Sequence, residues 1–203
     1  MNFKQYIIKD LAEVFSGYAF STNEMESNGI PILKIGNIQN HQITKETDSF
    51  YSNPIPSKLS KYILQRGDFL IAMTGAGSVG KTGKMVDFET PFLINQRVAI
   101  VRANPKKADP DFLFYFYSLE HIERFLYGLG IGAGQPNISA NDISGIKVLF
   151  PSLCAQQRIA SILSAYDNLI ENNNKRNQNL GTNGGEPVQR MVRSFPFPRP
   201  RNH

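Results

Sequence analysis

The chain has 203 residues, of which 41% are hydrophobic and 19% charged, so one well-packed core with an appendage is possible and disorder throughout is excluded. Cys154 is the only cysteine, which excludes an internal disulfide, a cysteine-based zinc site and a thiol redox pair. The net charge of +5 permits an anionic partner without requiring one.

Targeting and metal-binding signals are missing from the sequence. Charges interrupt the apolar stretch of the first fifteen residues, which is therefore neither a signal peptide nor a membrane span. The three histidines, at positions 41, 121 and 203, lie far apart without ligand spacing. We expect a soluble, cytoplasmic protein with no metal and no cofactor.

Short elements separated by polar loops are predicted for the amino-terminal half. Leu11, Val14 and Phe15 fall on one helical face, which predicts a short helix over residues 9–15 that ends at Ser16 and Gly17. Apolar and β-branched runs then predict β-structure at residues 30–38, 68–73 and 92–101. A glycine-rich segment follows the second of these, and we call residues 74–83 the first glycine loop.

An aromatic-rich helix is predicted over residues 111–127. Asp109 and Pro110 form a helix-start signal before it, and seven aromatic side chains lie within it. We expect these rings to pack against a sheet, the alternative being a stacking surface for nucleic-acid bases. Residues 128–136, the second glycine loop, lead to a strand over 146–150.

A different pattern begins at residue 155. Apolar side chains recur there at steps of three and four residues, which is typical of a helix that packs along another helix: Ile159, Ile162, Leu163, Tyr166, Leu169 and Ile170. We therefore place a domain boundary near Pro151. The expected fold is an α+β domain with a curved sheet and flanking helices over residues 1–150, followed by a protruding, coiled-coil-forming helix over 151–176.

Residues 75–82 match the phosphate-binding pattern GxxxxGK(S/T). That pattern holds phosphate only where a helix begins at its last two residues, because the N-terminal amides of the helix bind the anion. Gly83 and Pro91 leave no room for such a helix, and no later apolar run ends in an Asp that would hold magnesium. A P-loop nucleotide-binding enzyme is therefore the alternative rather than the favoured function.

The same loop carries groups suited to DNA phosphates, namely Thr74, Ser78, Lys81, Thr82 and Lys84. The amides of Asn95 and Gln96 match adenine, and the guanidinium of Arg97 matches guanine. The structural alternatives are a hairpin turn that needs glycine and the polar edge of a strand. The sequence shows no catalytic constellation, and Asp68 after Gly67 is interpreted as a turn former rather than an acid.

Taken in order, several segments resemble one half of the specificity subunit of type I restriction-modification systems. The most specific are QQRIASIL at 156–163 and DNLIENN at 167–173, and the others lie at 11–20, 29–38, 64–71, 95–98, 135–139 and 146–151. The similarity covers about residues 5 to 176. It adds Lys34, Asn37, Gln135 and Asn137 to the predicted DNA-contacting residues.

The resemblance implies a DNA-reading adaptor without catalysis of its own. Such subunits carry two target recognition domains joined by antiparallel helices; each domain reads half of a split site, and the helices dock two methyltransferase subunits. The implied partners are double-stranded DNA, methyltransferase subunits and, through them, the restriction subunit. Because only one half is present, self-pairing through residues 155–176 would rebuild a two-fold reader. The alternative is an inactive remnant.

Residues 177–203 depart from this pattern, since in the resembled family the helix continues into a Trp-Phe segment. Met191 and Val192 require the codons ATG-GTN, so a reading frame one base later forces TGG, the tryptophan codon. In that shifted frame, with third-position bases that the printed residues permit, the codons that follow encode Phe-Val-Arg-Phe-Arg-Phe-Pro-Gly-His-Glu. We therefore expect a frameshift near Asn177 and a non-native or disordered tail, the alternative being a linker or cloning artefact. Four arginines against Glu186 give this tail +3 of the total charge.

Overall fold

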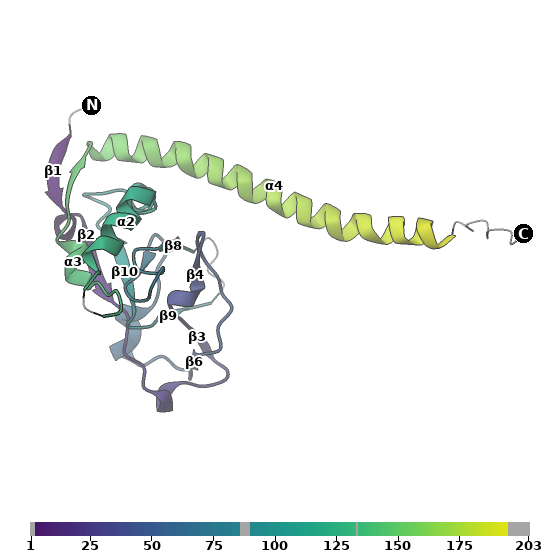
Figure 1. Ribbon diagram of the computed structural model, residues 1–203, viewed down its shortest axis with the longest axis horizontal. Helices are drawn as coiled ribbons and strands as arrows, with labels where there is room; N and C mark the ends of the chain where they lie inside the picture. Colours follow the sequence, from purple (N-terminus) through teal and green to yellow (C-terminus); the bar gives the residue numbers. More distant parts are fainter. Residues whose placement is uncertain (1–2, 86–89, 133, 195–203) are drawn as a thin grey trace, which may run out of the picture. The chain divides into compact units, whose positions relative to one another are not determined.

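The computed structural model describes residues 3–85, 90–132 and 134–194, the last of them (178–194) by their backbone only (Figure 1). The chain divides into two units, Met1–Ala160 and Ser161–His203. Strands and helices are mixed in the first unit, and the second is helical. The predicted α+β class is confirmed.

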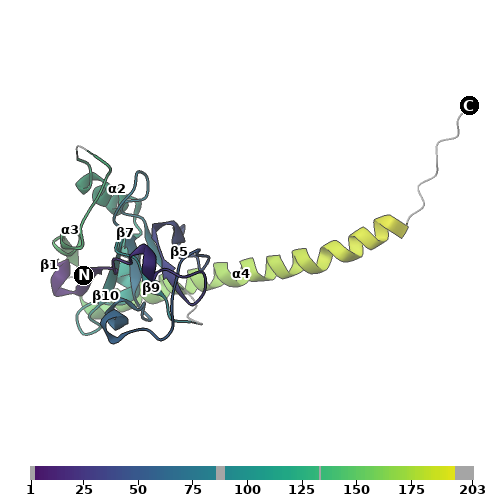
Figure 2. The same cartoon turned by 90° about the horizontal axis from the view of Figure 1, so that it is seen from below.

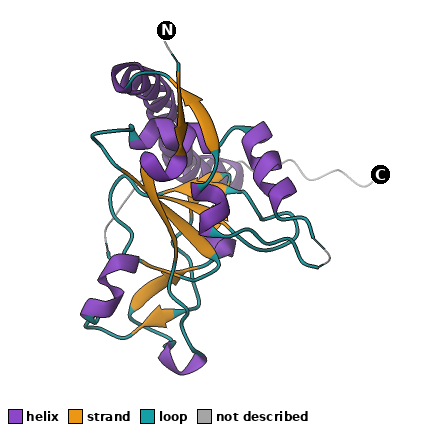
Figure 3. Ribbon diagram, turned by 90° about the vertical axis from the view of Figure 1, so that its left-hand side faces the viewer, coloured by secondary structure: helices purple, strands orange, loops and turns teal. Residues whose placement is uncertain are grey.

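Three β-sheets form the first unit, and their strands are coloured orange in Figure 3. The largest sheet has six strands in the order β2 (Ala12–Ser16), β10 (Val98–Ala103), β7 (Phe69–Ala72), β8 (Thr82–Lys84), β5 (His41–Ile43) and β4 (Ile38–Gln39). The three-stranded sheet has the order β6 (Phe50–Tyr51), β3 (Ile30–Leu33) and β9 (Leu93–Ile94), and the last sheet pairs β1 (Lys4–Ile7) with β11 (Lys147–Phe150).

Short helices connect these strands. Four of the described helices are 3-10 turns, η1 (Ile8–Asp10), η2 (Thr22–Glu24), η3 (Ile35–Asn37) and η4 (Ser57–Tyr62). The α-helices are α1 (Pro110–Tyr117), α2 (Glu120–Leu129), α3 (Ala140–Ser144) and α4 (Leu153–Ser194).

The core lies on both faces of β7 and β10. Along β7, Phe69 and Ile71 belong to a cluster that includes residues of α1, α2 and α3, whereas Leu70 and Ala72 join the cluster on the opposite face. A strand buried on both faces reads as a continuous apolar run, which is why its position was predictable. The strand expected over residues 68–73 is confirmed.

The helix predicted over residues 9–15 is wrong. A 3-10 turn ends at Asp10, and Ala12–Ser16 then forms strand β2, which pairs with β10 from Ala12 opposite Ala103 to Ser16 opposite Ala99. A run of only seven residues, with Leu11, Ala12 and Phe15 buried, is too short for its apolar pattern to decide between a helix and a strand. Pairing with a distant strand decides between them.

The aromatic helix predicted over residues 111–127 is two helices. The Ser118 hydroxyl donates to the Phe114 carbonyl at 2.9 Å, and the helix ends there before α2 begins at Glu120. A serine hydroxyl that bonds a preceding carbonyl competes with the continuing helix. The helix start is as expected, because the Asp109 carboxylate accepts the Phe112 amide at 2.9 Å.

The β-structure predicted at residues 30–38 is shorter than expected, and that predicted at residues 92–101 is interrupted. β3 ends at Leu33 and is followed by η3, while the turn at residues 95–97 separates β9 from β10. Polar residues in both ranges make turns instead of continuing a strand.

The helix α4 is continuous in both views of the chain (Figures 1 and 2). Its first turns belong to the first unit, because Gln156 Oε1 accepts the Asp109 amide at 3.1 Å and Gln156 Nε2 donates to the Pro151 carbonyl at 3.0 Å. The units therefore divide after Ala160, whereas the sequence placed the boundary at Pro151. The helical backbone extends past residue 176 to Ser194, and residues 195–203 of the predicted tail lie outside the described residues.

Candidate nucleic-acid interface

The two glycine loops, far apart in the sequence, lie side by side. The Gly75 amide donates to the Pro136 carbonyl at 3.2 Å, and the Ile138 amide donates to the Met73 carbonyl at 2.9 Å. These bonds join the two loops directly beyond the end of strand β7. A surface predicted from two separate segments is thus a single surface.

The turn at residues 95–97 joins the same surface. The Met73 amide donates to the Arg97 carbonyl at 3.0 Å, which places the turn beside the start of the first glycine loop. The Gln96 amide donates to the Tyr18 carbonyl at 2.9 Å, and Asn95 Oδ1 accepts the Arg97 amide at 3.1 Å. Backbone bonds therefore hold this turn while the Gln96 and Arg97 side chains are exposed.

Most of the predicted DNA-contacting residues gather here. We call their set the loop surface: Lys81, Gln96, Arg97, Gln135 and Asn137 are exposed, and Thr74, Ser78 and Asn95 are half-buried. The exposed side chains present amide, guanidinium and ammonium groups, which are groups that bind base edges and phosphates. The Thr74 hydroxyl is buried, with no hydrogen-bond partner among the described residues.

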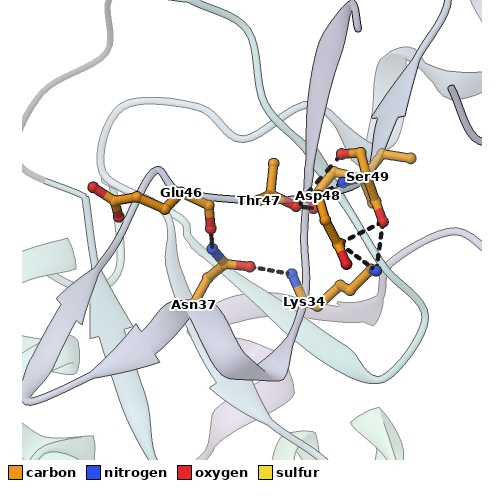
Figure 4. A network of polar contacts seen from close by, with 7 residues as sticks. Lys34, Asn37, Glu46, Thr47, Asp48 and Ser49 are labelled. Carbon is orange, nitrogen blue, oxygen red and sulfur yellow. Dashed lines mark hydrogen bonds and ion pairs between the residues drawn. The ribbon is translucent and has the colours of Figure 1, made fainter. Parts of the chain in front are cut away.

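Lys34 and Asn37 serve a different purpose (Figure 4). The Asn37 side chain is 5% exposed; its Oδ1 accepts the Lys34 amide at 2.8 Å, and its Nδ2 donates to the Thr44 and Glu46 carbonyls at 3.1 and 2.7 Å. The Lys34 ammonium lies 3.0 Å from Asp48 Oδ1 and donates to the Ser49 hydroxyl. The Asn37 side chain is thus engaged by bonds within the fold, and Lys34 is engaged in an ion pair.

Thr82 and Lys84, which were also predicted to contact DNA, are engaged by contacts within the fold. Thr82 is 1% exposed, and its hydroxyl lies 3.1 Å from that of Ser118. The Lys84 ammonium is half-buried and pairs with the Asp111 carboxylate. Thr82 and Lys84 are alternate residues of strand β8, so their side chains lie on the same face of the sheet.

The phosphate-loop pattern is not followed by a helix. Strand β8 begins at Thr82, and the Thr82 amide donates to Glu123 Oε1 at 3.3 Å, so a side-chain carboxylate occupies the donor that a phosphate would need. The requirement for helix amides behind the Lys-Thr pair is therefore unmet. The pattern has a structural role in this chain.

The aromatic side chains of α1 pack against the sheet, as expected. Phe114 and Tyr117 are buried, and their rings lie 6.0 and 5.6 Å from that of Phe69 in β7. Burial raises the pKa of the Tyr117 hydroxyl, which donates to the Ile143 carbonyl at 3.4 Å. These rings belong to the core, whereas Phe125 in α2 is exposed.

The apolar positions predicted on the long helix divide between the two units. Ile159 is half-buried in the first unit. The remaining positions are exposed in the second unit, with Ile162, Tyr166, Leu169 and Ile170 between 58% and 63% exposed and Leu163 at 38%. An exposed apolar row of this length is characteristic of an interaction site.

Two residues that contact the first glycine loop at Thr82 were not predicted from the sequence. His41 Nδ1 lies 3.5 Å from Glu123 Oε1, and both residues contact Thr82. Their sequence separation leaves no local pattern that would have revealed them. Within the described ranges, no group of three or more His, Cys, Asp or Glu side chains is placed to hold a metal ion, and no helix combines the length and apolarity needed to span a membrane.

Residues 1–182 match the model of the type I restriction modification DNA specificity domain. Two relatives from Methanocaldococcus jannaschii are the type I restriction enzyme MjaVIII specificity subunit, 32% identical over 175 residues, and the putative type I restriction enzyme MjaX specificity subunit, 27% identical over 174 residues. The alignments cover 85% and 83% of this chain but 41% and 40% of those proteins, so the chain spans about two fifths of the length of these relatives.

Solved structures share the fold. The HsdS subunit from Thermoanaerobacter tengcongensis matches with a TM-score of 0.59 at 17% identity, over 83% of this chain and 38% of that one. The type I restriction-modification S subunit from M. genitalium matches with a TM-score of 0.60 at 18% identity, over 85% and 41%. With the family match over most of its length, the chain belongs to the type I restriction modification DNA specificity domain family.

Proposed function

We propose that this chain binds double-stranded DNA in a sequence-specific manner, as one target recognition domain of a type I restriction-modification specificity subunit, and catalyses no reaction itself. The observation that carries the proposal is the loop surface. Three segments distant in sequence bring exposed amide, guanidinium and ammonium groups together, held by backbone bonds at Met73 and Gly75. The match of residues 1–182 to a DNA specificity domain supports DNA as the ligand of this surface.

The groups of the loop surface divide by the chemistry they support. Arg97 has the two-pronged donor geometry that fits guanine, and the Gln96 and Asn137 amides fit adenine. The exposed Lys81 ammonium suits phosphate oxygens, and phosphate contacts fix position on the duplex without reading sequence. We therefore assign base readout to the turn at residues 95–97 and phosphate contact to Lys81.

The test begins with the recognised site. Genomic DNA is treated with the cognate methyltransferase, with and without this chain, and adenine methylation is mapped at base resolution. We expect methylation of a split site only in the presence of the chain. A symmetric site would indicate self-pairing of two copies. An absence of new methylation would contradict the proposed function and favour the inactive remnant.

Variants of the loop surface separate the two assigned roles. On the mapped site, Arg97→Ala is expected to weaken binding about tenfold and relax the preference at one base pair, whereas Lys81→Ala weakens binding to all sequences and reduces the slope of log affinity against log salt by about 1. Fluorescence anisotropy over a salt series measures both effects. Lys147→Ala, an exposed lysine on the two-stranded sheet, is the control. Equal effects of all three substitutions would contradict the assignment.

We infer that the exposed apolar row of α4 contacts the methyltransferase subunit or a second copy of this chain. Ile162→Glu combined with Ile170→Glu places two charges in that row and is expected to abolish co-purification with the methyltransferase or self-association, because buried unpaired carboxylates are costly. Asn168→Glu lies on the opposite side of the same helix and serves as the matched control. Co-purification and sedimentation of the purified chain distinguish the two partners. Retention of both interactions by the double variant would contradict the inference.

A further inference from the structure

The carboxylate of Glu123, from α2, contacts the end of the first glycine loop. Glu123 Oε1 accepts the Thr82 amide at 3.3 Å and the Thr82 hydroxyl at 3.4 Å, and it lies 3.5 Å from His41 Nδ1. The Glu123 side chain is 23% exposed, so these contacts are partly shielded from water. One carboxylate oxygen thus contacts two other segments of the chain, at Thr82 and at His41.

Those segments are themselves joined around Thr82. The Thr82 hydroxyl lies 3.1 Å from the Ser118 hydroxyl and 3.4 Å from His41 Nδ1. His41 stands where β5 begins, with φ of 62°, and is paired in register with Gly83 of β8. We call His41, Thr82, Ser118 and Glu123 the Glu123 cluster.

The backbone just before Thr82 packs closely against α2, the helix that carries Glu123. Gly80 has φ of 87°, and a Cβ atom there would lie 2.7 Å from the Glu123 carbonyl oxygen and 3.0 Å from Leu126 Cβ. Only glycine allows this approach and this backbone conformation. The Gly80 amide also donates to the Ala72 carbonyl at 3.0 Å.

Lys81 stands between these two fixed residues and is exposed. With Gly80 against α2 and Thr82 bonded to Glu123, the backbone on both sides of Lys81 is held. We propose that Glu123 is a positioning residue, which fixes the first glycine loop so that the Lys81 ammonium is presented to DNA. This inference rests on the proposed function and assigns to α2 a part in DNA binding without direct contact.

Removal of the Glu123 carboxylate is expected to change the affinity for DNA in opposite directions, depending on whether its charge or its bonds to Thr82 matter more. A negative charge near DNA repels the phosphates, so its loss alone would strengthen binding slightly. Loss of the bonds to Thr82 would let the loop move and weaken binding. The sign of the change therefore distinguishes the two effects.

Matched variants on α2 provide the test. Glu123→Ala is expected to weaken binding to the mapped DNA site about fivefold, whereas Glu123→Gln, which keeps a carbonyl acceptor for the Thr82 amide, binds at least as tightly as the unaltered chain. Glu120→Ala removes the same charge from an exposed position on the same helix, 78% exposed and paired with Arg124, and is expected to leave affinity unchanged or slightly higher. Equal affinities of Glu123→Ala and Glu120→Ala would overturn the proposal.

Hydrogen exchange of the DNA-free chain gives a second measurement. Amides of residues 76–82 are expected to exchange faster in Glu123→Ala than in Glu120→Ala or Glu123→Gln, with the amides of β7 and β10 as internal references for global stability. Unchanged protection of residues 76–82 would overturn the proposal independently of DNA. If the unaltered chain binds no DNA, the proposed function fails, and the exchange measurement still decides whether Glu123 holds the loop.

Discussion

Replacement of Asp68 by alanine is expected to lower the free energy of unfolding by about 3–5 kcal/mol. Asp68 is 2% exposed; its Oδ1 accepts Arg102 Nε at 2.9 Å, and its Oδ2 accepts an Arg102 terminal nitrogen at 2.7 Å. Its removal leaves the largely buried guanidinium without a counter-charge. The Gln65 amide, which Asp68 Oδ2 accepts at 2.8 Å, also loses its partner.

Urea denaturation followed by circular dichroism measures the loss. Asp68→Asn preserves the shape of the side chain and one acceptor oxygen, so a smaller loss is expected from it than from alanine. Glu120→Ala breaks an exposed ion pair with Arg124 and is expected to change the free energy of unfolding by less than about 0.5 kcal/mol. A loss for Asp68→Ala as small as that of this control would show that the Asp68–Arg102 pair does not stabilise the fold.

A single methyl group at Gly17 is expected to be nearly as disruptive. A Cβ atom there would lie 2.2 Å from the Ile94 carbonyl oxygen and 2.4 Å from that of Asn95. Both are backbone atoms that cannot rotate away, and the Gly17 amide is held to the Val98 carbonyl at 2.9 Å. We expect Gly17→Ala to cost about 3 kcal/mol of unfolding free energy, at the upper end of overpacking effects.

The control for this substitution is Gly36→Ala. A Cβ atom at Gly36 would meet nothing within 4 Å, so a change within about 0.5 kcal/mol is expected. Gly17→Ala is also expected to weaken DNA binding, because the adjacent Tyr18 carbonyl accepts the Gln96 amide at 2.9 Å in the turn to which we assign base readout. Thermal unfolding and anisotropy titration check the two effects separately. Equal stability of the two alanine variants would contradict the expectation.

The parts of the fold that were predictable have strong local signals. The strand β7 is a short apolar run buried on both faces, and α1 begins at the Asp109 and Pro110 signal. One of the failures depends on a distant contact and the other on a local side-chain bond. Residues 9–15 form a strand because β10 lies beside them, and the helix at 111–127 is interrupted at Ser118, whose hydroxyl bonds back to Phe114.

The same distinction applies to the loop surface. Glycine, amide and cationic residues in the two glycine loops and the turn at residues 95–97 indicated a polar surface, and the structure brings these segments together. Composition could not show that Asn37 and Thr82 face inward, since a polar residue in a loop serves either the loop or a ligand. The role of Glu123 depends on contacts between residues 41 positions apart, which no local pattern records.

The antiparallel pairing of β7 with β10 separates the proposed DNA-contacting side chains from the residues that stabilise the fold. Ala72 is paired with Val98, so the first glycine loop and the turn at residues 95–97 lie at the same end of this strand pair. Behind them, all of β7 and the first four residues of β10 are buried. The exposed side chains Lys81, Gln96 and Arg97 take no part in the core. Under the proposed assignment, substitutions at Gln96 and Arg97 are expected to alter the target sequence, and those at Lys81 the overall affinity, at little cost in stability.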